Sequence, residues 1–257
     1  MIKLLNNKEH KKEELISKMH DDSFYYGELG KLAFSSSIIK LLLDSPKVYH
    51  YTMLYGNPET QPLRDGRLIH MILLEPNKFY DLNFINVASK NTKAYKQAVQ
   101  EYGVVYTKKE KENAERVADA FLKNENALRL LKDTKFEVPS IEMLNGYAFR
   151  GKADILTENG IIDLKTSNDV KNSFRYSAKK YHYDVQCYIY CKIFKRDYEN
   201  FKFLVIDKGS LDIALYDCSE EFYKSGEQKV NTALKDYIRF FEKKEYNLDD
   251  YIITGIL

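Results

Sequence analysis

Long apolar runs, paired cysteines and a secretory leader are all missing from this sequence of 257 residues. No apolar stretch approaches the ~20 residues that a membrane-spanning helix needs, so a membrane protein is not expected. Residues 1–20 are rich in Lys and Glu and contain no apolar signal core, which predicts a chain that stays in the cytoplasm. Cys187, Cys191 and Cys218 are too few for a disulfide framework. Cys187 and Cys191, four residues apart on an expected helix, are interpreted as buried thiols because no second close pair completes a metal site.

An excess of one charge is also missing. The chain has 40 Lys and Arg against 38 Asp and Glu, and a net charge of +2 gives no global signature of nucleic-acid binding. Any basic surface must therefore be local. The candidate segments, each of which could equally be a solvated helix face, are 90–96, 108–111 and 171–180.

The pattern of apolar residues and turn signals changes near Lys135. Before it, the sequence predicts helices at 9–20, 35–55 with a new helix beginning at Pro46, 63–74, 92–102 and 109–131, the last in one or two pieces, and an extended segment at 81–88. After it, strands are predicted at 136–143, 147–156, 161–166, 201–207 and 212–217, with helices at 183–195 and 220–243 and an extended tail after Tyr246. No linker separates the halves. We therefore expect one α/β domain over 1–257, with a helical half, 1–134, packed on a sheet-containing core, 135–245.

The segment Gly151 to Lys165 concentrates reactive side chains on one predicted hairpin. In Ile161-Ile162-Asp163-Leu164-Lys165 the period of two sends Asp163 and Lys165 to one face of the strand. A two-residue turn at Glu158-Asn159 or at Asn159-Gly160 would place Asp154 opposite Asp163 or Lys165, and a one-residue slip would send Asp154 to the other face.

Two aspartates and a lysine suffice for metal-dependent hydrolysis. Paired carboxylates favour Mg²⁺, which polarises a phosphoryl oxygen and lowers the pKa of bound water. A lysine can stabilise charge that develops in the transition state. An Asp-x-Lys pair on a strand is, however, also common as a simple exposed ion pair.

The surrounding motifs distinguish these alternatives. Gly-x-x-Asp followed by Asp163-Leu164-Lys165-Thr166 resembles the core of the PD-(D/E)xK nuclease superfamily, with Asp in place of the commoner Glu. Gln186 and Tyr190 have the Gln-x-x-x-Tyr spacing of its RecB-like branch, and His70 with Leu73-Leu74-Glu75-Pro76 resembles that branch's histidine motif. Together with Ser35 to Ser37, Ser45-Pro46 and Tyr181 to Gln186, these motifs resemble the phage exonuclease VIII (RecE-like) family from about Ser35 to Phe241.

That resemblance implies a PD-(D/E)xK nuclease core and a Mg²⁺-dependent 5′-to-3′ exodeoxyribonuclease, with Mn²⁺ able to substitute. Such an enzyme degrades one strand of linear double-stranded DNA and leaves a 3′ single-stranded tail for recombination by annealing. By resemblance, His70, Asp154, Asp163 and the carbonyl of Leu164 would bind the metal, and Lys165 would be the catalytic lysine. The implied partners are a single-strand annealing protein and further copies of the chain in a ring, in the cytoplasm of a bacterial host cell.

Several residues and functions keep alternatives. Gln186 and Tyr190 would support the site or contact the DNA backbone, or form a polar face of a packed helix. Glu142 could contact metal through water or be an ordinary strand carboxylate. Ser35, Ser36 and Ser37 could hold a 5′ phosphate at a helix N-terminus or cap that helix. The alternative functions are an endonuclease of the same superfamily and a non-catalytic DNA-end-binding adaptor.

Overall fold

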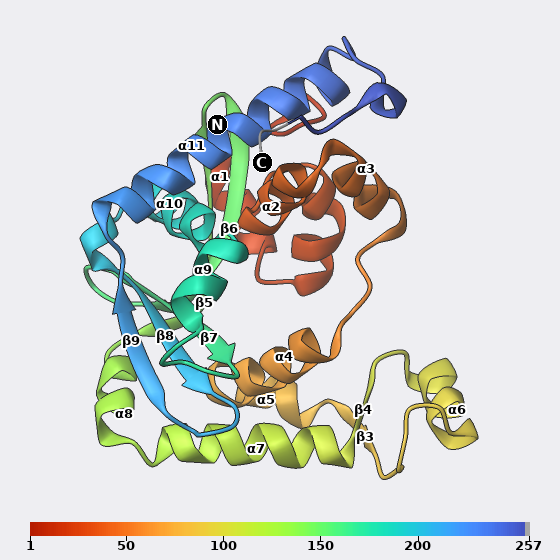
Figure 1. The fold of residues 1–257 in the computed structure, drawn as a ribbon, viewed down its shortest axis with the longest axis vertical. Coiled ribbons are helices and arrows are strands. Elements are labelled where there is room, and N and C mark those ends of the chain that lie inside the picture. Colours follow the sequence, from red (N-terminus) through yellow and green to blue (C-terminus); the bar gives the residue numbers. More distant parts are fainter. Residues whose placement is uncertain (255–257) are drawn as a thin grey trace.

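A five-stranded mixed sheet lies at the centre of the protein, in a computed structural model that describes residues 1–254 (Figure 1). The strand order is β5-β6-β7-β8-β9; the β7–β8 pair is parallel and the other pairs are antiparallel. The strands β5 to β9 span Lys135–Leu144, Tyr147–Leu156, Ile161–Ser167, Phe201–Asp207 and Ile213–Asp217. The predicted α/β class with a mixed central sheet flanked by helices is confirmed.

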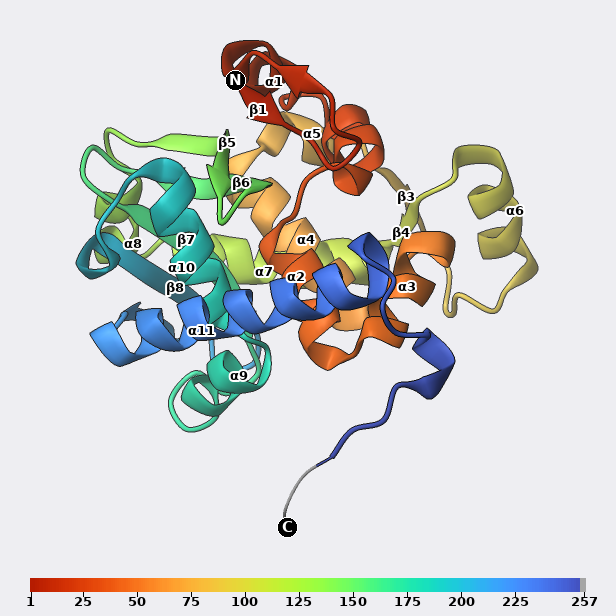
Figure 2. The same cartoon turned by 90° about the horizontal axis from the view of Figure 1, so that it is seen from above.

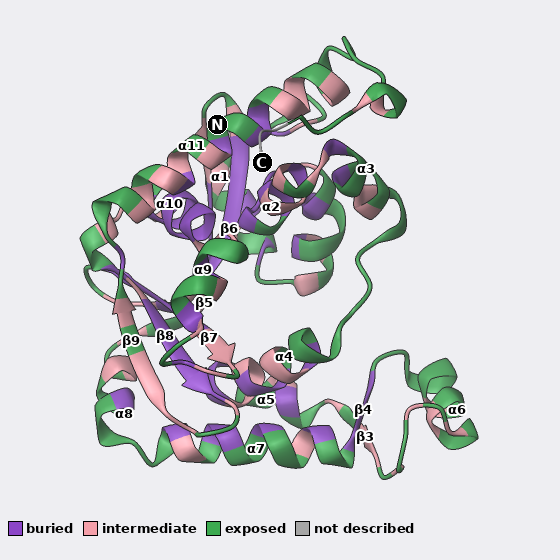
Figure 3. Cartoon of the chain, viewed as in Figure 1, coloured by how far each residue is buried: buried purple, intermediate pink, exposed green. Residues whose placement is uncertain are grey.

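The alternation along β8 explains why helices cover both faces of this sheet. Phe203 and Val205 pack in a core cluster with α2, α10 and α11, whereas Leu204 and Ile206 pack in a second cluster with α4 and α7. Because successive side chains of a strand point to opposite faces, a strand with two buried faces must be apolar throughout. Figure 3 shows β8 buried along most of its length. The helices named here are α2 Ser36–Asp44, α4 Gln61–Leu74, α7 Lys108–Leu122, α10 Tyr183–Phe194 and α11 Glu220–Tyr237.

The N-terminal residues form a third packed cluster. Ile2 and Leu4 lie with Leu15 against Ile141 and Ala148 of the β5–β6 hairpin. Strands β1 Ile2–Lys3 and β2 Glu9–His10 pair with each other ahead of α1 Lys12–Lys18, and helical turns follow at Ser23–Glu28 and Leu29–Lys31. The predicted helix at 9–20 is therefore too long at its N-terminal end, because residues 9 and 10 belong to this small sheet.

One segment projects from the body of the protein. Helix α6, Lys93–Tyr102, contains no buried residue and lies beyond α7 in both Figure 1 and Figure 2. Strands β3 Asn83–Ile85 and β4 Val105–Thr107, which pair in parallel, connect it to the rest of the chain. The sequence predicted α6 closely but did not predict β4.

The remaining elements agree with the sequence at most boundaries. Pro46 is the first residue of α3, Pro46–Tyr55, as predicted, and the predicted helix at 109–131 divides at 123–124 into α7 and α8, Glu125–Leu131. Helices α5 Pro76–Tyr80 and α9 Phe174–Lys180 were not predicted. The tail after Tyr246 contains a 3₁₀ turn, Leu248–Asp250, and its predicted extension over 255–257 lies outside the described residues. Within 1–254 no helix has the length and apolarity to cross a membrane.

The crossing of α10 and α11 depends on a glycine. A Cβ at Gly226 would lie 2.1 Å from the carbonyl oxygen of Asp184, which is backbone and cannot move aside. We expect Gly226→Ala to lower the free energy of unfolding by about 3 kcal/mol, because overpacking must displace one helix. Chemical denaturation measures this loss. Gly27→Ala is the control, since no atom lies within 4 Å of a Cβ there; equal losses in the two variants would contradict the close crossing.

Candidate active site

The β6–β7 hairpin has one of the two registers that the sequence allowed. The amide of Thr157 donates to the carbonyl of Gly160 at 3.0 Å, which closes the two-residue turn Glu158-Asn159. Ile155 then pairs with Ile162, and the next position in this register would set Asp154 opposite Asp163. The strand pairing stops before that position.

Asp154 occupies the point where β6 and β7 part. Its Oδ2 accepts a hydrogen bond of 2.8 Å from the amide of Leu164, so a side chain takes the place of a strand carbonyl. The three predicted residues Asp154, Asp163 and Lys165 come together where the strands diverge, not on a continuous flat ladder.

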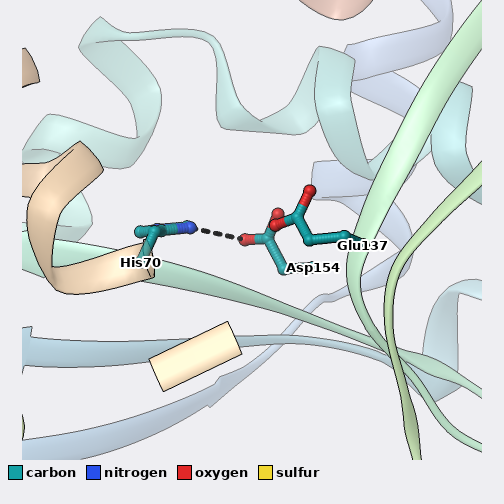
Figure 4. Close-up of side chains that lie close together, drawn as sticks. All are labelled: His70, Glu137 and Asp154. Carbon is teal, nitrogen blue, oxygen red and sulfur yellow. Dashed lines mark ion pairs between the residues drawn. The ribbon is translucent and has the colours of Figure 1, made fainter. Parts of the chain in front are cut away.

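His70 reaches this point from α4. Its Nε2 lies 2.7 Å from the carbonyl oxygen of Leu164; because a carbonyl can only accept, Nε2 donates. Nδ1 then faces Asp154 Oδ2 at 3.7 Å, the contact drawn as a dashed line in Figure 4, which is an ion pair only when the imidazole carries both protons. Leu68, Ile69 and Leu73 of the same helix are buried in the core, and this packing fixes where His70 points.

Glu137 of β5 completes a group that the sequence did not predict. One ligand atom each of His70, Glu137 and Asp154 lies within 4.8 Å of the others, and Figure 4 shows the two carboxylates side by side facing the imidazole. Glu137 has a left-handed φ of 50° and is skipped in the pairing of β5 with β6, although its neighbours Phe136 and Val138 are paired. This local distortion aims the side chain at Asp154.

The electrostatics of the group suit a divalent cation. Burial raises the pKa of Asp154 to about 6, and the negative charge of Asp163 adds to the effect. Burial, followed by the charge of Asp154, raises the pKa of Glu137 to about 8. Two carboxylates whose charged forms are disfavoured, beside one imidazole, form an oxygen-rich donor set that a hard divalent ion would stabilise. The residues present therefore fit such an ion.

Asp163 is not among these three residues and has other contacts. It is fully buried, forms an ion pair with Lys165 and accepts a hydrogen bond from Gln186 Nε2. It is not part of the three-residue group, so its predicted metal ligation stays a prediction. Burial alone would lower the pKa of Lys165, but Asp163 and Asp154 outweigh burial and raise it, so that Lys165 is an ammonium.

Gln186 and Tyr190 form hydrogen bonds with two different strands. Gln186 binds Asp163 of β7, whereas the hydroxyl of Tyr190 donates to the carbonyl of Lys152 in β6 at 3.1 Å. Tyr190 packs against Gly151, where a Cβ would lie 2.9 Å from its ring. These contacts position the strands that carry Asp154 and Asp163.

A groove of about 1570 Å³ opens onto these residues. Its lining includes every predicted site residue except Asp163, which is buried, and Glu142. Ser35 Oγ accepts from the amide of Ile38 at 3.3 Å and caps α2, as expected for a helix N-terminus. Ser35, Ser36 and Ser37 all line the groove. Their binding of a 5′ phosphate stays a prediction.

The structure places Glu142 away from the groove. Its carboxylate forms an ion pair with Lys12 of α1 at 2.7 Å and a longer one with Lys195 at 3.6 Å. The interpretation as an ordinary strand carboxylate fits these contacts. The carboxylate of β5 that lies near His70 is Glu137, five residues earlier.

The fold and the site define a nuclease of the PD-(D/E)xK class. Residues 35–247 match the family model described as a PDDEXK-like domain of unknown function (DUF3799), and the chain belongs to this family. The resemblance to that superfamily is thereby confirmed, and the match is consistent with a RecE-like nuclease. Members of this class generally use divalent metals.

A solved structure shares this fold. A protein from Eubacterium rectale assigned as an exonuclease superposes with a TM-score of 0.65 and 16% identity, over 92% of this chain and 95% of that one. A phage-related exonuclease from Haemophilus somnus aligns with a TM-score of 0.35 and 18% identity, over 62% of this chain and 90% of that one. Among curated proteins the sequence has no match.

Proposed function

We propose that the protein is a Mg²⁺-dependent 5′-to-3′ exodeoxyribonuclease that degrades one strand of linear double-stranded DNA and leaves a 3′ single-stranded tail. The observation that carries the proposal is a groove in which His70, Glu137 and Asp154 gather beside Lys165. The fold shared with a protein assigned as an exonuclease supports the same reaction class.

The charge of the groove supports a nucleic-acid substrate. Although the whole chain carries only +2, the groove is lined by eight Lys and Arg against five Asp and Glu. Two of the basic residues, Arg150 and Lys152, lie on β6 four and two residues before Asp154. Arg150 is buried, and its Nε has no hydrogen-bond partner among the described residues.

Each site residue then has a defined task. His70, Glu137 and Asp154 would hold the metal, which supplies charge neutralisation at the phosphate and an acidified water. Lys165, held by Asp163, would stabilise the negative charge that develops on the phosphoryl oxygens. Gln186 and Tyr190 keep the two strands in register. The carbonyl of Leu164, 2.7 Å from His70 Nε2, remains a candidate ligand.

The partners follow from the product and stay part of the proposal. A 3′ single-stranded tail is the substrate of a single-strand annealing protein. A ring of identical subunits around the duplex would keep the enzyme on its substrate, as the resemblance to RecE-like nucleases implies.

Metal removal and substrate topology test the proposal together. With 5′-phosphorylated linear duplex and Mg²⁺ we expect release of nucleotides, which EDTA abolishes and Mn²⁺ in place of Mg²⁺ retains. A label at the 5′ end should be released before a label at the 3′ end. Covalently closed circles of the same sequence should stay intact.

Each other outcome excludes part of the proposal. Cleavage of closed circles would indicate an endonuclease, and earlier release of the 3′ label would reverse the polarity. Binding to ends without any cleavage in Mg²⁺ or Mn²⁺ would leave the DNA-end-binding adaptor.

A further inference from the structure

A second lysine lies in the groove near Lys165 without a carboxylate partner. Lys40 of α2 lines the groove and is partly buried. Within residues 1–254 no carboxylate lies within ion-pair distance of the Lys40 Nζ. Lys165, in contrast, forms an ion pair with Asp163. Burial and then the positive charge of Lys165 lower the pKa of Lys40 to about 7. The fold therefore places an amine in the groove whose charged form no directly paired carboxylate stabilises.

The ring of Tyr183 lies close to the ammonium groups of both Lys40 and Lys165. Lys40 Nζ lies 5.0 Å from the centre of its ring, and Lys165 Nζ lies 5.1 Å from the same centre. Both distances are within the range of cation–π attraction. Tyr183 is the first residue of α10, three residues before Gln186. The ring therefore belongs to the same helix as Gln186, which hydrogen-bonds Asp163 of β7.

We propose that Lys40 binds a backbone phosphate of the DNA strand that is being cut, adjacent to the phosphate on which Lys165 acts. The inference rests on the proposed function, and it adds a substrate-binding residue outside the PD-(D/E)xK motif. Lys40 comes from the helical N-terminal half, whereas Lys165 comes from the sheet. Helix α2 therefore takes part in substrate binding through a side chain one turn beyond its first residues.

A role in stability alone does not explain Lys40. A partly buried ammonium without a partner carries a desolvation cost, and an apolar residue of similar length at that position would remove the cost. Asp163 and Asp184 favour the charged form of Lys40, but less than burial and Lys165 oppose it. A bound phosphate supplies the missing negative charge, and it does so only when DNA occupies the groove.

Binding of a 5′-phosphorylated duplex in EDTA tests the inference without cleavage. Lys40→Met should raise the Kd about tenfold and reduce the slope of log K against log salt by about one, the signature of one lost phosphate contact. Lys40→Arg should restore most of the affinity. Lys123→Met is the matched control, because Lys123 directly follows α7, pairs with Asp119 and does not line the groove.

Thermal unfolding separates a substrate-binding role from a structural one. Lys40→Met should have an unchanged or higher Tm while it loses DNA affinity. Wild-type affinity and salt slope in Lys40→Met, or a lower Tm in this variant, would overturn the role of Lys40. If the wild-type protein did not bind the duplex, the proposed function itself would be overturned.

Discussion

Lys165→Ala should reduce nucleotide release from linear duplex by about a thousandfold, while the protein still folds and binds DNA ends. The ammonium of Lys165 is fixed by its ion pair with Asp163 and lies against Tyr183 and Phe203. A charge that is already oriented needs no reorganisation when the phosphoryl oxygens become more negative. Its loss therefore raises the barrier for cleavage more than it weakens binding.

Single-turnover cleavage at saturating DNA measures this effect separately from binding. Circular dichroism serves as the control for folding, because Lys165→Ala leaves the buried Asp163 with Gln186 as its remaining contact. Lys202→Ala is the control for charge, since Lys202 pairs with Asp217 at the sheet surface and does not line the groove. A rate within tenfold of wild type in Lys165→Ala would exclude the catalytic role.

Glu137→Gln should lower the cleavage rate at least about 100-fold at a metal concentration that saturates the wild type. The substitution keeps the size of the side chain and removes the negative charge that Glu137 would carry beside a bound metal ion with His70 and Asp154. More Mg²⁺ or Mn²⁺ should be needed for half-maximal rate, because a neutral amide is a weaker ligand for hard cations. A titration of cleavage rate against metal concentration gives both quantities.

Glu142→Gln is a matched control for that variant. Both glutamates lie on β5 and both are half-buried, but Glu142 pairs with Lys12 and does not line the groove. An ion pair of this exposure contributes about 1 kcal/mol or less to stability, so its loss should leave the metal dependence unchanged. If the two variants had the same metal dependence, the assignment of Glu137 to the metal group would fail.

The sequence predicted most of the sheet because its local signals agree with one another. Asn145 and Gly146, both with positive φ, form the turn that joins Leu144 to Tyr147, and the flanking strands begin and end within one residue of their predicted bounds. His70, Asp154, Lys165, Gln186 and Tyr190 could be grouped because motif spacing identified each of them. Their roles in catalysis remain predictions.

Glu137 was missed although a signal for it exists. Counting outward from the Leu144–Tyr147 pair places residue 137 opposite residue 154, as the neighbouring pairs Phe136–Ile155 and Val138–Ala153 show. The sequence does not reveal that Glu137 leaves the ladder with a left-handed φ. That conformation is uncommon for a residue with a side chain and depends on tertiary contacts.

The position of Asp163 shows a different limit. Alternation correctly separates Asp163 and Lys165 from Ile162 and Leu164, but it cannot show that β6 parts from β7 before reaching Asp163. The depth of Asp163 depends on Gln186, which arrives from a helix 23 residues later. Such long-range contacts carry no local pattern.

The two tight turns at Asn145-Gly146 and Glu158-Asn159 lie at opposite ends of β6, and each sets the register of β6 with one neighbouring strand. The register that the first turn sets between β5 and β6 places Asp154 at the level of Glu137. The register that the second turn sets between β6 and β7 places Asp154 at the level of Asp163. Surface turns usually accept insertions and deletions over evolutionary time. Here a single added residue in either turn would shift one strand by a step and rotate a carboxylate out of the group. We therefore expect natural variants of this chain to change in length at α6 and to keep the length of both turns.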